Sequence, residues 1–582
     1  MMRPRSAPAT LLGLVLVVTA SACGYRNDTP TVHLTDPGRC VPVDIAAAPE
    51  TASLLGDAAS RFNGSRAARL RGGACAFVRI VTVDSPVALR ELAGDWPDAA
   101  RLGPPPVAWV PGSTMWGELL NARLAEARRP AMAPAGTPFA RTPLVVAMPA
   151  PMARALGYPD RPVGWADLER LARDRRGWGA YGHAEWGRFR LGKANPNWST
   201  TGLDQTIALA ASPGGGDARL LERSVEYYGD STRAYFDNWQ RLATKSTSRA
   251  LTYLSAAIAD ERSVVAYNTG HGEDDEVLTG HATRPALHLV AVYPKDATIE
   301  SDNPIIVLDA SWSSPSARTG ARMFTRFALR RATQSMVAAA GLRPARGPVR
   351  SDLLGLANGA ATAPRVSSVA PASPVEIERA LERWQAIRRR ARVLFLFDVS
   401  DSMGDRSKTH GPTKIALARA ALAGALGQLA PDDEFGLRIF STDLANRIDT
   451  NWRDVVPIGP LASRRPALRA AIAGLAPHRG SPLYTATRAA YDTIARRFDP
   501  QRINAVVVLT DGYNEYDRDN NQRALLAHLA TRPDVHVFTI TYSNDADAAT
   551  LRKIAQTTNA WNYDARDTTL LTDLLARTLS SF

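Results

Sequence analysis

The chain has 582 residues and a formal net charge of +13, with 45% hydrophobic and 22% charged residues. This length fits about three or four folding units, and the composition excludes a mainly disordered chain. Most of the 70 basic residues are Arg, and they are interspersed with acids rather than gathered in a block. We therefore expect a solvated basic surface, and no motif of a nucleic-acid-binding module is present.

The N-terminus has the pattern of an export signal. Arg3 and Arg5 precede the apolar run LLGLVLVVTA and the small residues SACG. This run is too short to span a bilayer, which takes about 20 residues. ASAC followed by Gly resembles a bacterial lipoprotein signal, which implies cleavage after residues 1–22 and lipidation of Cys23. The alternative is an ordinary signal peptide with an incidental Cys. Residues 23–39 are polar and are expected to form a tether to the membrane.

Two further cysteines are candidates for a disulfide. Cys40 opens the apolar segment CVPVDIAA, and Cys75 opens CAFVRIVTV. An exported pair is free to oxidise, and adjacent parallel strands would bring the two residues together. We predict a Cys40–Cys75 disulfide; two free buried thiols are the alternative.

Residues 40–350 alternate short apolar strands with helical segments, a rhythm that predicts parallel sheets covered by helices. The first strands and helices are expected at 41–47, 50–63, 77–83, 86–94, 105–112 and 115–128, and later strands at 142–149, 263–270 and 288–294.

Residues 351–390 are predicted to separate two domains. Residues 357–374 are rich in Ala, Pro, Ser and Gly, a composition typical of a linker. Residues 375–390 have the apolar spacing of a helix, which we expect to pack onto the domain that follows.

The β/α rhythm restarts in residues 391–582. Near-continuous apolar strands indicate burial on both faces, as in a doubly wound parallel sheet. Strands are expected at 393–400, 435–441, 503–512 and 534–543, and helices at 414–430, 465–477, 483–498, 547–558 and 570–579.

Three loops of this domain carry candidate metal ligands. In an open parallel sheet, ligands bind at the carboxyl ends of the strands near the point where strand order reverses. Carboxylate and hydroxyl oxygens suit Mg²⁺, Mn²⁺ or Ca²⁺ rather than zinc. The loops DVSDS, HRGS and LTDG supply Asp398, Ser400, Ser402, Ser481 and Asp511, with Thr510 beside the last.

These motifs, with the tail TYSNDADAATLRKIA, resemble the von Willebrand factor A domain and its metal-ion-dependent adhesion site. The resemblance covers residues 391–582. It implies that Ser400 and Ser402 bind the metal directly, and Ser481 directly or through water. The two Asp residues then either bind the metal directly or hydrogen-bond to its ligands. A carboxylate from a partner protein fills an open coordination position of the metal. Here Ser481 replaces the usual Thr, and the neighbouring Arg479 either disfavours the metal or attracts an anionic ligand.

Catalytic alternatives have little support. A phospho-aspartyl enzyme needs a second Asp at position 400, where this chain has Ser. A Ser nucleophile needs a nearby base, and neither G-x-S-x-G nor H-E-x-x-H occurs. Loops that are merely capped, with no metal, are the remaining alternative. We predict a binding protein and not an enzyme.

Residues 40–350 resemble the bacterial extracellular solute-binding proteins of type II topology, a group that includes molybdate and sulfate receptors. The resembling segments are VAWVPGSTMWGELL, TPLVVAMPAPMARALGYP, GWADLERLA, WGRFRLGKANPNWSTTGL and SVVAYNTG, in that order. The resemblance implies two α/β lobes with a ligand cleft between them.

Hydroxyls ahead of two predicted helices, and polar residues at a predicted strand end, are candidates for binding a small polar or anionic solute. Plain helix caps are the alternative for the hydroxyls. The candidates are Ser113, Thr114, Ser199, Thr200, Thr201, Tyr267 and Asn268. Trp178, Trp186 and Trp198 either line a pocket or pack in the core.

Together these patterns predict a two-lobed solute-binding fold followed by a doubly wound von Willebrand factor A domain. We expect the chain to be lipid-anchored on the extracytoplasmic face of the cell membrane, in a Gram-positive type of envelope, where a divalent metal docks a protein partner. The alternatives are a solute receptor of an ABC-type transporter and, with less support, a hydrolase.

Overall fold

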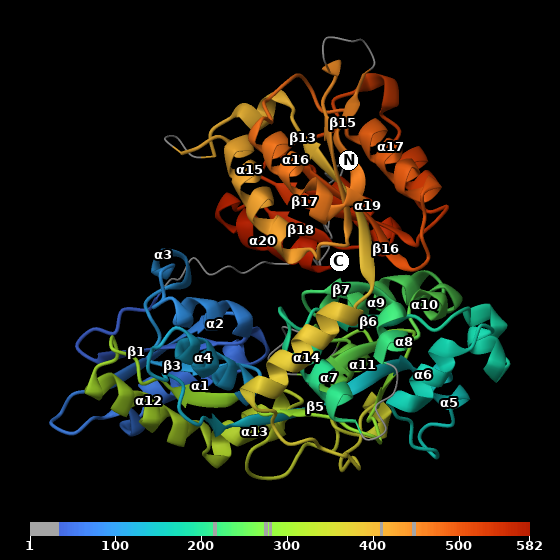
Figure 1. Cartoon of the computed structure of the whole chain (residues 1–582). Helices are drawn as coiled ribbons and strands as arrows, with labels where there is room; N and C mark the ends of the chain where they lie inside the picture. The colour runs from blue at the N-terminus through green and yellow to red at the C-terminus, as the bar shows by residue number, and fades with distance from the viewer. Residues whose placement is uncertain (1–33, 213–217, 273–277, 279–281, 408–410, 445–449) are drawn as a thin grey trace, which may run out of the picture.

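The computed structural model describes residues 34–212, 218–272, 278, 282–407, 411–444 and 450–582. The expected signal and Cys23 lie outside these residues. Figure 1 shows two side-by-side lobes built from the first part of the chain, with an α/β domain from the last third above them. None of the helices in the described ranges is long and apolar enough to cross a membrane.

The first lobe contains a five-stranded sheet in the order β2-β1-β3-β11-β4. Strand β1 runs parallel to both of its neighbours, β2 and β3. A disulfide joins Cys40 to Cys75 directly before the first paired residues of β1 and β2. The strands are β1 (Val41–Ala47), β2 (Ala76–Thr82), β3 (Ala108–Val110), β4 (Thr137–Pro138) and β11 (Pro304–Val307). The helices are α1 (Pro49–Asn63), α2 (Ser85–Ala93), α3 (Ala99–Leu102), α4 (Thr114–Glu126), α12 (Pro315–Ala328) and α13 (Arg331–Ala339).

The second lobe is built on a sheet in the order β10-β5-β8-β6-β7, with β9 and β12 also paired to β5. The chain passes between the lobes three times, from β4 to β5, from β10 to β11 and from α13 to β12. The strands are β5 (Ala140–Pro149), β6 (Leu191–Ala194), β7 (Val225–Gly229), β8 (Ala256–Asp260), β9 (Leu289–Val292), β10 (Glu300–Ser301) and β12 (Arg343–Pro344). The helices are α5 (Ala150–Ala155), α6 (Trp165–Arg173), α7 (Thr200–Ala211), α8 (Ala218–Arg223), α9 (Arg233–Lys245), α10 (Thr247–Tyr253) and α11 (Glu261–Thr269).

The strand expected at 263–270 is wrong, because this segment forms helix α11. The side chain of Asp260 caps the helix by accepting a 2.7 Å hydrogen bond from the backbone N–H of Ser263. Gly270 ends it with φ of 83°, a left-handed conformation that glycine adopts at little cost. All nine residues of α11 are buried. The short apolar run VVAY within it is compatible with either a buried strand or a buried helix, so its period alone does not distinguish them.

The helix expected at 375–390 is present as α14 (Pro374–Ile387), but it packs onto the preceding lobe and not onto the domain that follows. Nε1 of Trp384 donates a 3.2 Å hydrogen bond to Glu222 of α8, and the indole meets the ring of Tyr228 edge-on. Ser373 and Glu376 form a capping box at its start. The helix therefore belongs to the solute-binding lobes.

The C-terminal domain has a six-stranded sheet in the order β15-β14-β13-β16-β17-β18. Every pair is parallel except β14 with β15, an antiparallel edge strand that the sequence did not indicate. The strands are β13 (Arg390–Asp398), β14 (Glu434–Phe440), β15 (Trp452–Pro460), β16 (Arg502–Thr510), β17 (Val535–Tyr542) and β18 (Asn562–Ala565). The helices are α15 (Lys414–Ala425), α16 (Leu461–Ala473), α17 (Leu483–Arg496), α18 (Gln522–Leu529), α19 (Ala548–Thr557) and α20 (Leu571–Ser580).

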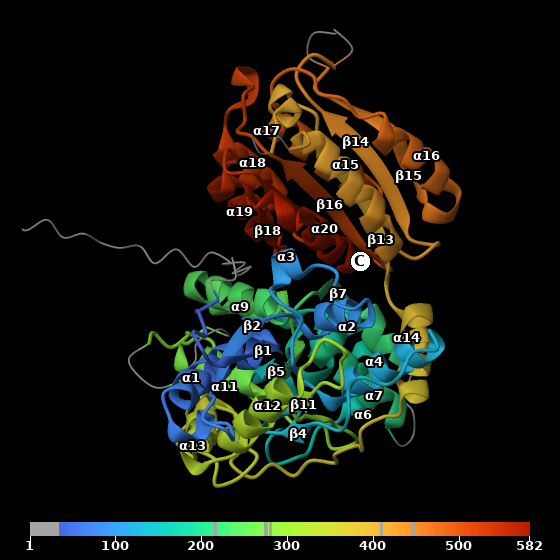
Figure 2. The ribbon, with the colours of Figure 1, turned by 90° about the vertical axis from the view of Figure 1, so that its left-hand side faces the viewer.

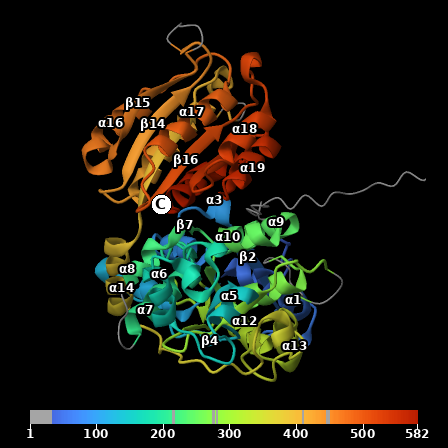
Figure 3. The ribbon, with the colours of Figure 1, turned by 90° about the vertical axis from the view of Figure 1, so that its right-hand side faces the viewer.

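The C-terminal domain rests on the second lobe through its last residues. Figures 2 and 3 place α20 and the C-terminus at the boundary between the two parts. Nδ2 of Asn195 donates to the carbonyl oxygen of Ser580 over 2.8 Å, and the N–H of Tyr228 donates to that of Ser581 over 2.9 Å. The ring of Tyr227 also packs edge-on against that of Phe538.

Candidate functional sites: a metal-type cluster and an interlobe cleft

The carboxylate of Asp398 lies at the end of β13 and is fully buried. Its Oδ2 accepts hydrogen bonds from Oγ1 of Thr510 (2.5 Å) and from Oγ of Ser481 (3.2 Å). Its Oδ1 accepts from the N–H of Ser400. Burial, together with the nearby charge of Asp511, raises the pKa of Asp398 to about 7. All three predicted loops therefore meet at this carboxylate.

The second carboxylate, Asp511, follows the neighbouring strand β16. Its Oδ1 accepts a 2.8 Å hydrogen bond from Oγ of Ser402, which is itself 3.1 Å from Oγ of Ser400. Strands β13 and β16 are adjacent, and the chain leaves them in opposite directions along the sheet. This is the switch point at which doubly wound sheets hold ligands.

Lys414, the first residue of α15, adds a positive charge that the sequence interpretation missed. Its Nζ lies 2.8 Å from Oδ2 of Asp511 and 3.2 Å from Oδ2 of Asp545. Burial disfavours the charged ammonium, but the hydrogen bonds and charges of these two carboxylates outweigh it and raise the pKa of Lys414. The ammonium thus neutralises part of the charge that a metal would neutralise.

The loop that contains Ser481 is also held by a hydrogen bond to Glu515. The N–H of Ser481 donates a 3.1 Å hydrogen bond to Glu515, a second acidic residue that the sequence interpretation missed. Arg479 is largely exposed, and its Nη1 lies 3.4 Å from Oδ2 of Asp443. Its guanidinium is therefore paired at the rim of the cluster.

The residues present fit a hard divalent cation. Two carboxylates and several hydroxyls converge, and such oxygen donors suit Mg²⁺, which takes one or two carboxylates and keeps several waters. The described residues contain no group of three or more His, Cys, Asp and Glu side chains that could hold a metal. The hydroxyls are therefore essential members of this donor set, which we call the metal-type cluster: Asp398, Ser400, Ser402, Ser481, Thr510 and Asp511.

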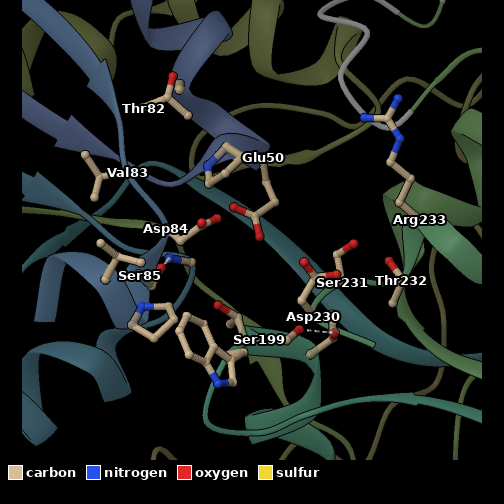
Figure 4. Close-up of a pocket in the computed structure, with 18 of the residues that line it drawn as sticks. Glu50, Thr82, Val83, Asp84, Ser85, Ser199, Asp230, Ser231, Thr232 and Arg233 are labelled. Carbon is tan, nitrogen blue, oxygen red and sulfur yellow. Dashed lines mark hydrogen bonds between the residues drawn. The ribbon is translucent and has the colours of Figure 1, made fainter. Parts of the chain in front are cut away.

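A second site lies between the two lobes and beneath the C-terminal domain. It is a cavity of about 600 Å³, a size typical of small-molecule sites. Its lining comes from both lobes and from α20, and Figure 4 shows Glu50, Asp84 and Asp230 facing this space. The close approach of the lobes is visible at Gly112, where an added Cβ would lie 2.6 Å from Oγ1 of Thr200.

Three of the predicted solute ligands line this cavity: Ser199, Thr200 and Thr201. Oγ of Ser199 lies 2.9 Å from Oγ1 of Thr201, and Thr200 accepts a 3.0 Å hydrogen bond from Nε1 of Trp116. Trp198 lines the cavity as well.

The other predicted solute residues serve the fold and are absent from the cavity lining. Ser113 caps α4, and Thr114 binds Asp302 through both its N–H and its hydroxyl. Asn268 bridges Leu289 and Asn358 through its amide. Tyr267 sits on α11 and not at a strand end, and its hydroxyl is buried.

Two of the three tryptophans under consideration are core residues. Trp178 is fully buried, and its Nε1 donates to Oγ of Ser255. Trp186 packs edge-on against it.

The sequence interpretation also missed the acidic residues that line the cavity, because isolated Asp and Glu residues at strand and helix ends carry no local signal for a cleft.

Comparison with known proteins identifies both parts of the chain. The family model for bacterial extracellular solute-binding proteins matches residues 43–343, and the model for the von Willebrand factor type A domain matches residues 393–577. No match is found among curated proteins.

Solved structures of both kinds are similar to parts of the chain. The sulfate-binding protein SubI from Mycobacterium tuberculosis H37Rv is 18% identical, covers 56% of this chain and 93% of its own, and has a TM-score of 0.35. A von Willebrand factor type A structure from Catenulispora acidiphila is 19% identical with a TM-score of 0.28, and the match spans 33% of this chain and 42% of that one. The PilB minor pilin from Streptococcus sanguinis is 16% identical with a TM-score of 0.28, over 33% of this chain and 60% of that one.

The family match implies an extracytoplasmic location. With more than half of its length matched, the chain belongs to the bacterial extracellular solute-binding proteins and carries a C-terminal von Willebrand factor type A domain.

Proposed function

We propose that this protein is a lipid-anchored binding protein of the extracytoplasmic membrane face that docks a protein partner through a divalent metal. The observation that carries the proposal is the convergence of three loops on Asp398, with Ser481 and Thr510 both donating to its Oδ2. Mg²⁺, with Mn²⁺ or Ca²⁺ as alternatives, would bind among the oxygens of the metal-type cluster.

The metal would link this protein to its partner by binding oxygen ligands from both. A hard divalent cation bound by few carboxylates retains affinity for a further oxygen ligand. A carboxylate of the partner would supply that ligand, while Asp398 and Asp511 hold the hydroxyls of Ser481 and Ser402 in place through hydrogen bonds. The protein residues would thus position the metal without acting on a substrate.

The test is retention of a partner from a cell-envelope extract by the immobilised chain, in Mg²⁺ or in EDTA. We expect a partner that binds in Mg²⁺, is lost in EDTA and is lost with Asp398→Ala. The exposed Ser463→Ala, on α16 of the same domain, is the matched control and should retain it. Equal retention in EDTA would contradict the docking role.

The anchor is tested separately. Cys23→Ala should move the protein from the membrane fraction to the medium, because the acyl chains contribute about 0.8 kcal/mol per buried CH₂. Retention of the Cys23→Ala protein in the membrane fraction would contradict lipid anchoring.

The interlobe cavity supports a second candidate function, that of a solute receptor. A cavity of about 600 Å³ lined from both lobes is large enough for a small polar molecule. A solute that binds the folded chain should raise its melting temperature by linkage. This function is compatible with the first, because the metal-type cluster and the cavity are built from different residues.

A further inference from the structure

Helix α20 of the C-terminal domain lies at the cleft between the two lobes. The helix contributes Asp573, Leu574 and Arg577 to the cavity lining. Leu570, the residue before its start, lines the cavity as well. Asp573 accepts a 2.6 Å hydrogen bond from Nη1 of Arg101 in the first lobe. The carbonyl of Ser580 accepts from Asn195 of the second lobe. A single helix therefore contacts both lobes.

Arg577 makes the central contact of this helix. Its Nη2 donates to Oδ2 of Asp84, which follows strand β2 of the first lobe. Its Nη1 lies 3.7 Å from Oδ2 of Asp230, which follows strand β7 of the second lobe. The side chain is 16% exposed. The guanidinium thus joins one carboxylate from each lobe across the cleft.

The aromatic ring of Trp198 also contacts the guanidinium of Arg577. The guanidinium carbon of Arg577 lies 5.5 Å from the ring centroid of Trp198, within the range of a cation–π contact. Trp198 belongs to the cavity lining and also contacts Arg90 at 4.6 Å. Two carboxylates and an aromatic face are the groups that recognise an organic cation.

The surrounding charges also favour a cation. The charged residues of the cavity's described lining are five acids and four bases: Glu50, Asp84, Asp230, Asp260, Asp573, Arg101, Arg233, Arg262 and Arg577. Burial, with added repulsion from Asp84 and Asp260, raises the pKa of Glu50 to about 7. Burial raises the pKa of Asp230 as well, although Arg577 opposes this shift. Displacement of Arg577 would leave five carboxyl groups and three guanidinium groups in this lining, and an incoming cation would replace the lost charge.

We propose that the cleft binds a solute carrying a guanidinium or primary ammonium group, and that Arg577 is a tethered competitor which the solute displaces from Asp84, Asp230 and Trp198. This differs from the polar or anionic solute expected from the sequence. Solute entry breaks the link that Arg577 makes between the C-terminal domain and both lobes. The inference rests on the cleft being a solute site and does not depend on the metal.

The test is calorimetric titration of the full mature chain with agmatine, which carries a guanidinium and an ammonium, in the presence of EDTA. Arg577→Gln should bind agmatine about tenfold more tightly or better, because apparent affinity falls in proportion to the fraction of sites open to the ligand. Arg469→Gln removes the same charge from an exposed position on α16 and should behave as the wild type does.

A second substitution tests the site itself. Asp84→Asn in the Arg577→Gln background should weaken agmatine binding again. Arg577→Lys, which keeps a charge on a side chain with poorer geometry for two carboxylates, should give an intermediate affinity and replaces Arg577→Gln if that variant does not fold.

Three outcomes overturn the inference. The first is equal agmatine affinity in wild type and Arg577→Gln. The second is binding of sulfate, the anionic control, in place of agmatine; the cleft would then remain a solute site, but one for anions. The third is binding of neither compound by any variant, which also counts against the solute-receptor function. Each outcome leaves metal-dependent docking unaffected, since EDTA is present throughout.

Discussion

Oγ of Ser402 donates a 2.8 Å hydrogen bond to Oδ1 of Asp511, a residue 109 positions later in the chain. This bond joins the loops after β13 and β16, the two strands at the switch point of the sheet. It holds a hydroxyl and a carboxylate at the separation that one cation can share. Hydrogen bonds between its own residues thus hold the loops of the metal-type cluster together.

Lys414 is expected to compete with the metal. In Lys414→Gln, Asp511 loses the ammonium that lies 2.8 Å from it in a buried position. Without metal, the variant should unfold with a free energy lower by about 3 kcal/mol, the cost of breaking a buried ion pair. Excess Mg²⁺ should recover more of this loss than it adds to the wild type, as measured by urea unfolding in EDTA and in Mg²⁺.

Lys553→Gln, an exposed position on α19, is the charge-matched control and should change neither measurement. Weaker Mg²⁺ binding by Lys414→Gln than by the wild type would show that the ammonium supports the metal instead of replacing it.

Asp204 of α7 should make stability depend on pH. Its side chain is fully buried with Oδ1 unpartnered, and burial raises its pKa to about 7 although Ser301 donates to Oδ2. The unfolded pKa is about 3.9. Because the folded pKa is the higher one, the stabilisation of the protonated form is complete below about pH 4 and is lost as the pH rises through 7.

Asp204→Asn removes this titration. Relative to the wild type, the variant should gain up to about 4 kcal/mol between about pH 4 and pH 8 in urea unfolding. The exposed Asp57→Asn on α1 should track the wild-type profile. A difference between Asp204→Asn and the wild type that stays constant across this range would contradict a buried, titrating Asp204.

Trp384 should stabilise the second lobe rather than the C-terminal domain. The side chain is 2% exposed and meets Glu222 and Tyr228. Trp384→Ala should cost about 4 kcal/mol, and hydrogen exchange of the full chain should rise first in β7 and α8. Glu382→Ala, exposed on the same helix, should have little effect. Faster exchange in β13 and β16 with β7 unchanged would support the packing first expected from the sequence.

Several parts of the fold could be predicted from the sequence because their signals are local. Strands β13, β16 and β17 are largely apolar and mostly buried, as expected for a sheet covered on both faces. Helix α11 contains only the short apolar run VVAY, which is compatible with either a strand or a helix. The docking of α14 depends on Glu222, which lies 162 residues from its partner Trp384.

The two candidate sites also differ in how far local sequence motifs predict them. Asp398, Ser400 and Ser402 form a short motif, so the metal-type cluster could be recognised before its geometry was known. Lys414 and Glu515 carry no motif and enter the cluster through folding alone. In the cleft, Arg577 meets Asp84 across 493 positions, a contact between domains that no local pattern indicates.

The central claim is that the metal-type cluster binds a divalent cation, and calorimetric titration of the full chain with Mg²⁺ tests it most directly. We predict one Mg²⁺ bound per wild-type chain and per Ser463→Ala chain, and none bound by Asp398→Asn or Ser402→Ala. At a Mg²⁺ concentration of about 100 times the Kd, the wild type should also gain about 2.7 kcal/mol of stability. Absence of binding to the wild type, or undiminished binding to Asp398→Asn, would contradict the account.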